Sequence, residues 1–191
     1  MIRSAQMEFA NEVFRMFARA TRLMTQAAAA PLMAMTLASS PAWSQDFAAP
    51  KGEVLLTASG KITATNSDGA LTLDQAQLAA LPQYSFTTST TWTEGTPTFQ
   101  GVLLKDFIAA VGATGTTINL TALNDYQITM PFADVKGDGP LLAYLMDGKP
   151  MSVRDKGPVW LVFLSDANAD YRTEQTNARS IWQLDRIEFV E

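Results

Sequence analysis

Two of the side chains that most often carry catalysis are missing from this sequence of 191 residues. It holds no His, the usual general base near neutral pH, and no Cys, the usual thiolate nucleophile and soft metal ligand. A Ser-His-Asp arrangement is therefore impossible, no Gly-rich phosphate motif is present, and the carboxylates are scattered along the chain. The remaining side chains are better suited to ligand binding than to catalysis.

Four cations late in the chain are candidates for binding an anion. Arg154 and Lys156 come before the apolar run Val159–Leu164, and Arg172 and Arg179 lie in the long polar segment after it. A guanidinium matches the geometry of a phosphate or carboxylate, so we expect Arg154, Arg172 and Arg179 to meet at one pocket if a ligand site is present. The alternative is ordinary surface charge, balanced by the Asp and Glu residues beside each cation.

The same polar segment begins like a calcium-binding loop, with Asp166, Asn168 and Asp170 at alternate positions. Such a loop needs Gly at its sixth position and Glu at its twelfth, where this chain has Tyr171 and Asn177. We therefore interpret the segment as a polar turn.

The pattern of apolar and turn-forming residues predicts an α+β fold dominated by strands in mixed sheets. Asp74 is expected to cap a helix at Gln75–Ala80, and Gly112 to end a second helix whose apolar face begins at Val102. The run Val159–Leu164 is expected to be a central strand, buried on both faces. In all we predict about eight short strands and two or three short helices. The strands are expected at Glu53–Ser59 with Lys61–Thr65 as a continuation, Leu71–Leu73, Tyr84–Trp92, Thr117–Leu123, Tyr126–Met130, Leu141–Met146, Pro150–Val153, Val159–Leu164 and Ile181–Val190.

Several stretches together resemble one known family. The pattern T-x-x-T-W-T followed by F-x-G-V-x-L-x-D-F-I-x-x-V-G, at 88–112, is similar to the central motif of the oxidoreductase molybdopterin-binding domain. Sulfite oxidases and the catalytic subunit of periplasmic methionine-sulfoxide reductases share that fold. L-T-L-D-Q-A-Q-L-A-A-L-P, A-L-N-D-Y, G-P-V-W-L-V-F-L and S-I-W-Q-L-D-R-I-E-F extend the resemblance over about Glu53–Glu191. It implies a sulfite-oxidase-like, molybdopterin-binding fold.

The resemblance also implies where a cofactor would sit, and this chain departs from the family there. The molybdenum-binding Cys of the family falls at or near Thr88, and a neutral hydroxyl is a poor substitute for a thiolate. Around Lys156–Trp160 relatives carry His and Arg that help to hold the pterin phosphate, whereas here Trp160 occupies the Arg position. We expect Thr88, Thr90 and Trp92 to line the mouth of the presumed pocket. The alternative is that the Thr hydroxyls bond locally and the Trp packs in the core.

Asn124 and Tyr126 are expected to add a polar edge to that pocket. Their alternative role is structural, because Asn and Asp readily build a turn and a Tyr can bury its ring with the hydroxyl at the rim.

The N-terminal residues indicate export. Residues 1–44 combine a basic region with an apolar run of about a dozen residues and the small-residue pattern Ala42-Trp43-Ser44, which is typical of a secretory signal peptide. The apolar run is too short for a spanning helix, so no stable membrane insertion is expected once the signal is removed. We therefore predict a signal peptide at 1–44, a loose linker at 45–52, a single domain at 53–191 and a periplasmic or secreted location.

Charge limits the class of partner. Residues 1–44 hold four Arg and two Glu, so the rest of the chain has 10 basic and 17 acidic residues and a net charge of about −7. That balance disfavours nucleic acid and anionic membranes.

Taken together, the residues predict an exported binding or accessory module on a molybdopterin-oxidoreductase scaffold, with no cofactor and with a small anionic ligand or a membrane-bound redox or sensor partner. The alternative is a molybdopterin-dependent oxidoreductase with an atypical metal site. Enzymatic activity is left open, and the missing Cys and His favour the non-catalytic interpretation.

Overall fold

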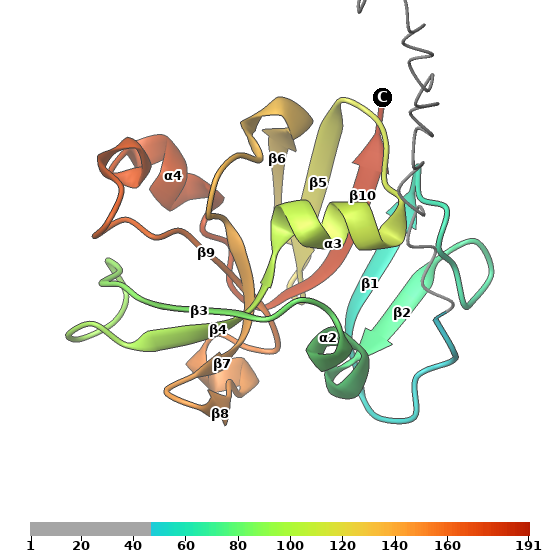
Figure 1. Cartoon of the computed structure of the whole chain (residues 1–191), viewed down its shortest axis with the longest axis horizontal. Coiled ribbons are helices and arrows are strands. Elements are labelled where there is room, and N and C mark those ends of the chain that lie inside the picture. The colour runs from blue at the N-terminus through green and yellow to red at the C-terminus, as the bar shows by residue number, and fades with distance from the viewer. Residues whose placement is uncertain (1–46) are drawn as a thin grey trace, which may run out of the picture. The chain divides into compact units, whose positions relative to one another are not determined.

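The computed structural model describes residues 47–191, which form two β-sheets with three α-helices in this part of the chain (Figure 1). The predicted signal peptide, residues 1–44, and the first two residues of the predicted linker lie outside the described residues. Among 47–191 no helix is both long enough and apolar enough to span a bilayer. The strands are β1 (Val54–Gly60), β2 (Leu71–Asp74), β3 (Tyr84–Thr87), β4 (Thr98–Leu103), β5 (Thr117–Ala122), β6 (Gln127–Pro131), β7 (Leu141–Met146), β8 (Lys149–Pro150), β9 (Trp160–Val162) and β10 (Leu184–Val190). The helices are α2 (Gln75–Ala80), α3 (Leu104–Val111) and α4 (Glu174–Arg179), with 3-10 turns η1 (Phe132–Asp134), η2 (Val153–Asp155) and η3 (Ala169–Tyr171).

The first sheet has the order β2-β1-β10-β5-β6. β1 and β10 pair in parallel, with Thr57 opposite Arg186, while the other neighbours are antiparallel. The last strand along the chain therefore lies at the centre of the sheet, between β1 and β5. Its alternating pattern buries Leu184, Ile187 and Phe189 against the main core.

The second sheet runs β3-β4-β7-β8, and β9 also pairs with β7. β9 is buried as predicted, but it is not a central strand, because only β7 joins it by a regular ladder. Its other edge is covered by the irregular segment before β10, where the Leu161 N–H donates to the Ile181 carbonyl at 2.9 Å. The length and apolarity of a sequence run do not distinguish a buried strand that is paired on both edges from one that is paired on a single edge.

The helices follow local sequence signals. Asp74 caps α2, as predicted, in a capping box with Gln77, and Leu78 and Leu81 are buried. Gly112 ends α3 in the left-handed conformation, with φ of 60°. The start of that helix was predicted wrongly, because Val102 and Leu103 belong to β4. Both side chains are buried in either arrangement, and pairing with β7 decides the outcome.

The described part of the predicted linker is held by the domain. Phe47 packs against the core, and the Ala48 carbonyl accepts hydrogen bonds from the Gln77 and Asn66 side chains. The Lys51 and Gly52 amides both donate to the Asp74 carboxylate at 2.9 Å. The Asp74 pKa lies below its ordinary value, mainly because the Gln77 amide also donates to this carboxylate. The loose linker predicted from composition is therefore wrong for the described residues, because these hydrogen bonds hold them against the domain.

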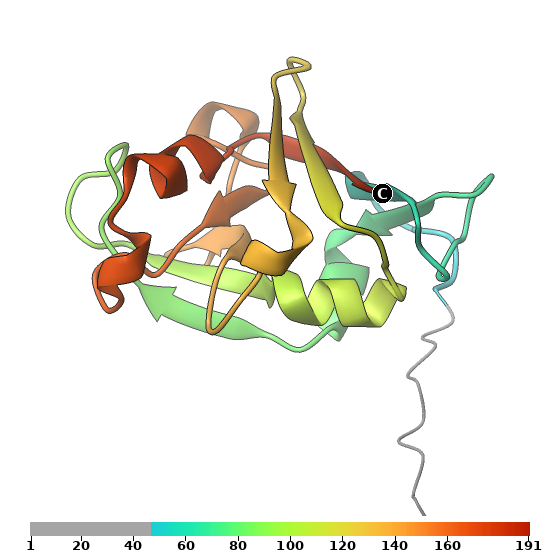
Figure 2. The ribbon, with the colours of Figure 1, turned by 90° about the horizontal axis from the view of Figure 1, so that it is seen from above.

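Two segments far apart in sequence meet at one end of the second sheet. Pairing between β3 and β4 stops at Thr87 and Thr98, which leaves 88–97 as a loop rather than the end of a longer predicted strand. In both views this green loop lies at the same end of the molecule as the red segment around α4 (Figures 1 and 2). The Ser89 amide donates to the Asp166 carboxylate at 2.6 Å, which joins the two segments directly.

Candidate functional site

A pocket of about 350 Å³ lies between loop 88–97 and the segment that follows β9. β9 and the loop form its aromatic wall, while the segment leading to α4 supplies hydroxyl, amide and charged groups. Its lining residues are Ser89, Thr90, Thr91, Trp92, Trp160, Val162, Phe163, Ser165, Asp166, Tyr171, Arg172, Asn177 and Ser180.

Thr88 was predicted to line this pocket, but it lies buried behind the lining. None of its surface is exposed, and it is not among the lining residues. Its hydroxyl accepts a hydrogen bond from the Asp166 amide at 3.2 Å and donates to the Ser89 carbonyl at 3.3 Å. The hydroxyl is therefore a structural link between the two segments.

Asp166 completes that link. Its two carboxylate oxygens accept from the Ser89 amide at 2.6 Å and from the Ser89 hydroxyl at 2.7 Å. These bonds hold the pKa of Asp166 below its ordinary value, the Ser89 amide having the largest effect. The carboxylate is therefore ionised at neutral pH, and both of its oxygens already have partners.

Of the four candidate cations, only Arg172 lines the pocket. Its Nε donates to the Ser165 carbonyl at 2.7 Å and its Nη2 to the Asp166 carbonyl at 2.6 Å. Two backbone groups thus fix the plane of the guanidinium. No hydrogen bond joins its Nη1 to any group within residues 47–191.

The other three cations do not meet at the pocket, which corrects the predicted convergence. Arg179 pairs with Asp134 at 2.8 Å on a half-buried surface, because α4 directs it toward the turn after β6. Lys156 places its Nζ 5.5 Å from the Trp160 ring centroid, as a cation–π contact. Arg154 is exposed in η2, outside the lining. The direction of Arg179 depends on Asp134, 45 positions earlier, which local composition could not reveal.

Trp92 is the aromatic centre of the site. Its ring meets Trp160 edge-on with 6.1 Å between centroids, and it meets Trp182 edge-on at 5.0 Å. Trp160 is fully buried against Phe99 and donates from Nε1 to the Ser180 carbonyl at 3.2 Å. Trp92 itself is partly exposed, so it combines packing with pocket lining. Thr90 lines the same pocket, and its hydroxyl hydrogen bonds with that of Thr93 at 2.9 Å.

Trp92 also borders a second pocket of about 350 Å³, which contains the predicted residues Asn124 and Tyr126. These two residues therefore do not join the first pocket; the residues common to both are Trp92, Asn177 and Ser180. The second pocket is lined by Trp92, Ala122, Asn124, Tyr126, Asn177, Ala178, Ser180, Ile181 and Trp182.

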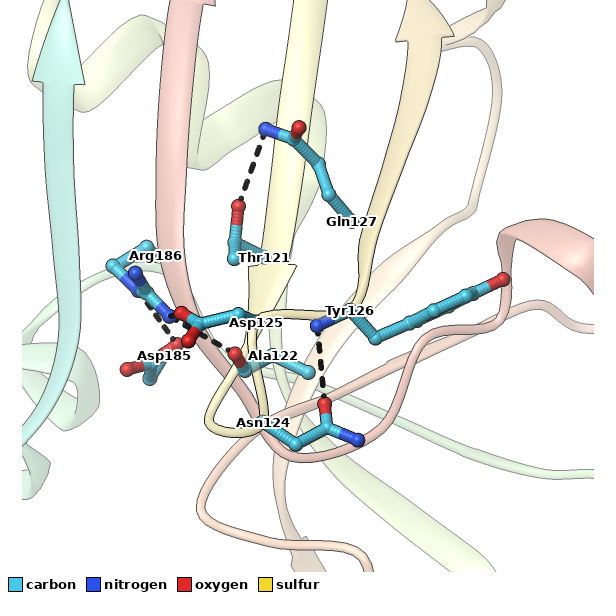
Figure 3. Close-up of polar contacts among 8 residues, drawn as sticks. All are labelled: Thr121, Ala122, Asn124, Asp125, Tyr126, Gln127, Asp185 and Arg186. Carbon is cyan, nitrogen blue, oxygen red and sulfur yellow. Dashed lines mark hydrogen bonds and ion pairs between the residues drawn. The ribbon is translucent and has the colours of Figure 1, made fainter.

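The turn between β5 and β6 sets the position of Tyr126 (Figure 3). Asn124 accepts from the Tyr126 amide at 3.2 Å, which is the predicted turn-building role. Asp125 adopts a positive φ of 63° and pairs with Arg186 at 2.7 Å. The Tyr126 ring projects away from the turn and stays 56% exposed, instead of burying its ring.

The acidic stretch after β9 is a turn, as interpreted from its sequence. Asn168 caps η3 by accepting from the Asp170 amide at 3.0 Å, and Asp166 serves Ser89. Within residues 47–191 no group of three or more Asp or Glu side chains could hold a metal ion.

Sequence reasoning did not single out several residues of the two pockets, among them Ser89, Asp166 as a loop anchor, and Trp182. Ser89 and Asp166 are 77 positions apart, so no local pattern connects them. Trp182 had a usable signal, since it is a large aromatic residue next to the polar Gln183 near the start of a predicted strand.

Comparisons with known proteins agree with the fold. Residues 64–165 match the family model described as the oxidoreductase molybdopterin binding domain. Among solved structures, the sulfane dehydrogenase SoxCD from Paracoccus pantotrophus is similar, with a TM-score of 0.52 and 15% sequence identity. The match covers 72% of this chain and 38% of that chain, so this chain spans well under half of that protein. No curated protein matches the sequence.

The family match extends over more than half of the 191 residues, and the structural match carries the same strand-dominated α+β fold. The fold predicted from the sequence is confirmed. The chain belongs to the oxidoreductase molybdopterin-binding domain family.

Proposed function

We propose that this chain is an exported binding module that uses the family scaffold without molybdenum catalysis, and that it binds a small anionic ligand in the pocket beside Arg172. The single observation behind the non-catalytic role is the state of Thr88. This residue stands at or near the position where the family resemblance places the metal-binding Cys, and here it is wholly buried with its hydroxyl already hydrogen-bonded on two sides.

The residues present do not fit the cofactor of the family. The chain has no thiolate or imidazole anywhere, and a neutral hydroxyl has little affinity for a metal that prefers soft sulfur ligands. Freeing the Thr88 hydroxyl would leave the Asp166 amide without its partner and remove one of the hydrogen bonds that join the two segments forming the pocket. We therefore derive no reaction step through molybdopterin.

The chemistry of the first pocket supports an anionic ligand of modest size. Arg172 is held by two carbonyls, so binding would not cost the entropy of ordering its long side chain. The Thr90 hydroxyl lies in the lining and can donate to a carboxylate, sulfate or phosphate oxygen when Thr93 is the donor of the hydrogen bond that the two share, whereas the Ser89, Ser165 and Ser180 hydroxyls already donate to protein oxygens. The Asp166 carboxylate opposes a large negative charge, which favours an anion with a single charge.

The proposal also includes export of the chain and binding to a partner protein. Export is supported by the basic, apolar and small-residue order of residues 1–44. A membrane-bound redox or sensor protein is the partner class we propose. The net negative charge after residue 44 argues against nucleic acid.

Elemental analysis of the protein purified from its native host tests the non-catalytic role. We expect far less than one molybdenum per chain, with no co-purified pterin. Stoichiometric molybdenum with a pterin would overturn the proposal and favour a molybdopterin-dependent oxidoreductase with an atypical metal site.

A second experiment tests the ligand class. Acetate and sulfate would be titrated into the full chain and into the Arg172→Gln and Arg154→Gln variants, with amide and indole NMR shifts as the readout. We expect Arg172→Gln to weaken anion binding about tenfold or more, since hydrogen bonds to charged groups contribute about 1.5–3 kcal/mol. Arg154→Gln, an exposed cation outside the lining, is the matched control and should bind as the parent does. Equal loss in both variants would show only a general charge effect.

A further inference from the structure

We propose that the second pocket is a separate site for a methylated ammonium cation, such as a quaternary ammonium group. The site is formed by Trp92 from the β3–β4 loop, Tyr126 from the β5–β6 turn and Trp182 from the segment before β10. Three segments distant in sequence thus bring aromatic rings to one cavity. The second pocket shares Trp92, Asn177 and Ser180 with the pocket beside Arg172, but the inference does not depend on Arg172 or on anion binding.

The arrangement of the rings is the first observation. The planes of Trp92 and Trp182 stand at 76° to each other with 5.0 Å between centroids, so the two indoles form a corner. Tyr126 lines the same cavity as the two indoles, and its ring projects away from its turn (Figure 3). Aromatic faces meeting at steep angles around a cavity are the arrangement that recognises quaternary ammonium ligands.

The exposure of these rings is the second observation. Tyr126 is 56% exposed, although aromatic side chains normally bury most of their surface, and Trp182 is 37% exposed. Both border a formed cavity of about 350 Å³ rather than a flat surface. A contiguous exposed aromatic wall commonly marks a binding site.

The charges around the cavity are the third observation, and they select a cation. Every lining residue is uncharged, and the polar ones are Asn124, Asn177 and Ser180 apart from the Tyr126 hydroxyl. Arg186 donates to the backbone carbonyl of the lining residue Ala122 and pairs with two carboxylates, Asp125 at 2.7 Å and Asp185 at 3.2 Å, so these three side chains together carry a net negative charge (Figure 3).

The uncharged lining and the net negative charge of Asp125, Asp185 and Arg186 therefore favour an approaching cation. The chain also shows the same chemistry within its own structure. The Lys156 ammonium already rests 5.5 Å from the centroid of Trp160, an indole that is in edge contact with Trp92. A methylated ammonium would use the remaining ring surface of the cluster, and its methyl groups would also bury apolar area.

The test compares choline with its uncharged isostere 3,3-dimethylbutan-1-ol, which has the same shape and no positive charge. Each would be titrated into the full chain at constant ionic strength, while the indole N–H signals of Trp92, Trp182 and Trp160 are followed by NMR. We expect choline to shift Trp92 and Trp182, with the isostere binding about tenfold more weakly. Equal affinity of the two probes would show a merely apolar pocket and overturn the proposal, as would the absence of any choline-dependent shift.

Variants of exposed residues separate binding from folding. Tyr126→Ala should weaken choline binding about fivefold or more, while Tyr126→Phe, which keeps the ring, should bind as the parent does. Leu123→Ala is the control, because Leu123 is 45% exposed beside the same turn but does not line the cavity. Unchanged binding in Tyr126→Ala would overturn the assignment. Arg172→Gln should leave choline binding intact, so the fate of this site is distinguishable from that of the anion pocket.

Discussion

Replacing Thr88 by Val tests whether its hydroxyl holds the two pocket-forming segments together. Val keeps the shape of the buried side chain but removes the acceptor of the Asp166 amide, 3.2 Å away, and the donor to the Ser89 carbonyl. Leaving one buried polar group without a partner costs about 1–3 kcal/mol. We therefore expect Thr88→Val to lower the free energy of unfolding by about 2 kcal/mol.

Thr88→Ser is the matched control, because it keeps the hydroxyl and removes one buried methyl group. Losing that methyl should cost about 1 kcal/mol, so Ser should be less destabilising than Val. Urea unfolding followed by tryptophan fluorescence measures both changes. By heat, a loss of 2 kcal/mol corresponds to about 4–8 °C in Tm for a domain of this size.

The order of the two variants decides the outcome. If Thr88→Val is as stable as the parent, or if Thr88→Ser is the more damaged variant, the hydroxyl is not a structural link and the reasoning fails. Hydrogen exchange at the Asp166 amide gives an independent readout, and it should accelerate in Thr88→Val but not in Thr88→Ser.

Three further changes have defined outcomes. The Asp166 pKa is lowered from its ordinary 3.8, mainly by the Ser89 amide. The contribution of this carboxylate to stability is therefore complete above pH 3.8 and is lost as pH falls through the folded-state pKa. Acid unfolding should be less steep in Asp166→Asn than in the parent, and an unchanged dependence of stability on pH would contradict this. Gly101→Ala should prevent stable folding, because a Cβ would overlap the Leu142 backbone carbonyl across β4 and β7, whereas Gly52→Ala, whose Cβ would meet Asp74 at an ordinary 3.5 Å, should fold normally; soluble yield and circular dichroism measure both. Trp160→Ala should lower the free energy of unfolding by about 3–5 kcal/mol, measured in urea, since its ring is fully buried, while Val153→Ala at a half-exposed position should change it by about 0.5 kcal/mol or less.

Local signals predicted much of the secondary structure. The cap at Asp74, the left-handed Gly112 and the strand Leu141–Met146 all depend on residues within a few positions of one another, and the structure confirms them. The start of α3 was wrong because Val102 and Leu103 are apolar enough for either element. Their pairing with Leu141 and Leu142 decided the matter, and that pairing is a long-range event.

The site was harder to predict than the fold, and the reason is again distance along the chain. Thr90, Trp92 and Arg172 do line one pocket. Arg179 does not line it, because its guanidinium pairs with Asp134, 45 positions earlier. Thr88 does not line it either, because its hydroxyl accepts a hydrogen bond from the Asp166 amide, 78 positions later. The sequence around a hydroxyl or guanidinium group does not indicate which distant residue will form a hydrogen bond with it. Residue type therefore identified candidates, while tertiary contacts chose among them.

The central place of β10 has a consequence for how the chain is made. β1 and β5 are synthesised early, yet each keeps one unpaired edge until residues 184–190 arrive to fill the gap between them. During vectorial synthesis, the first sheet thus stays incomplete until this late segment emerges. Deleting 184–190 would remove a central strand of the sheet and not an edge strand. The edges of β1 and β5 that β10 normally covers would then be free to pair with other copies of the chain.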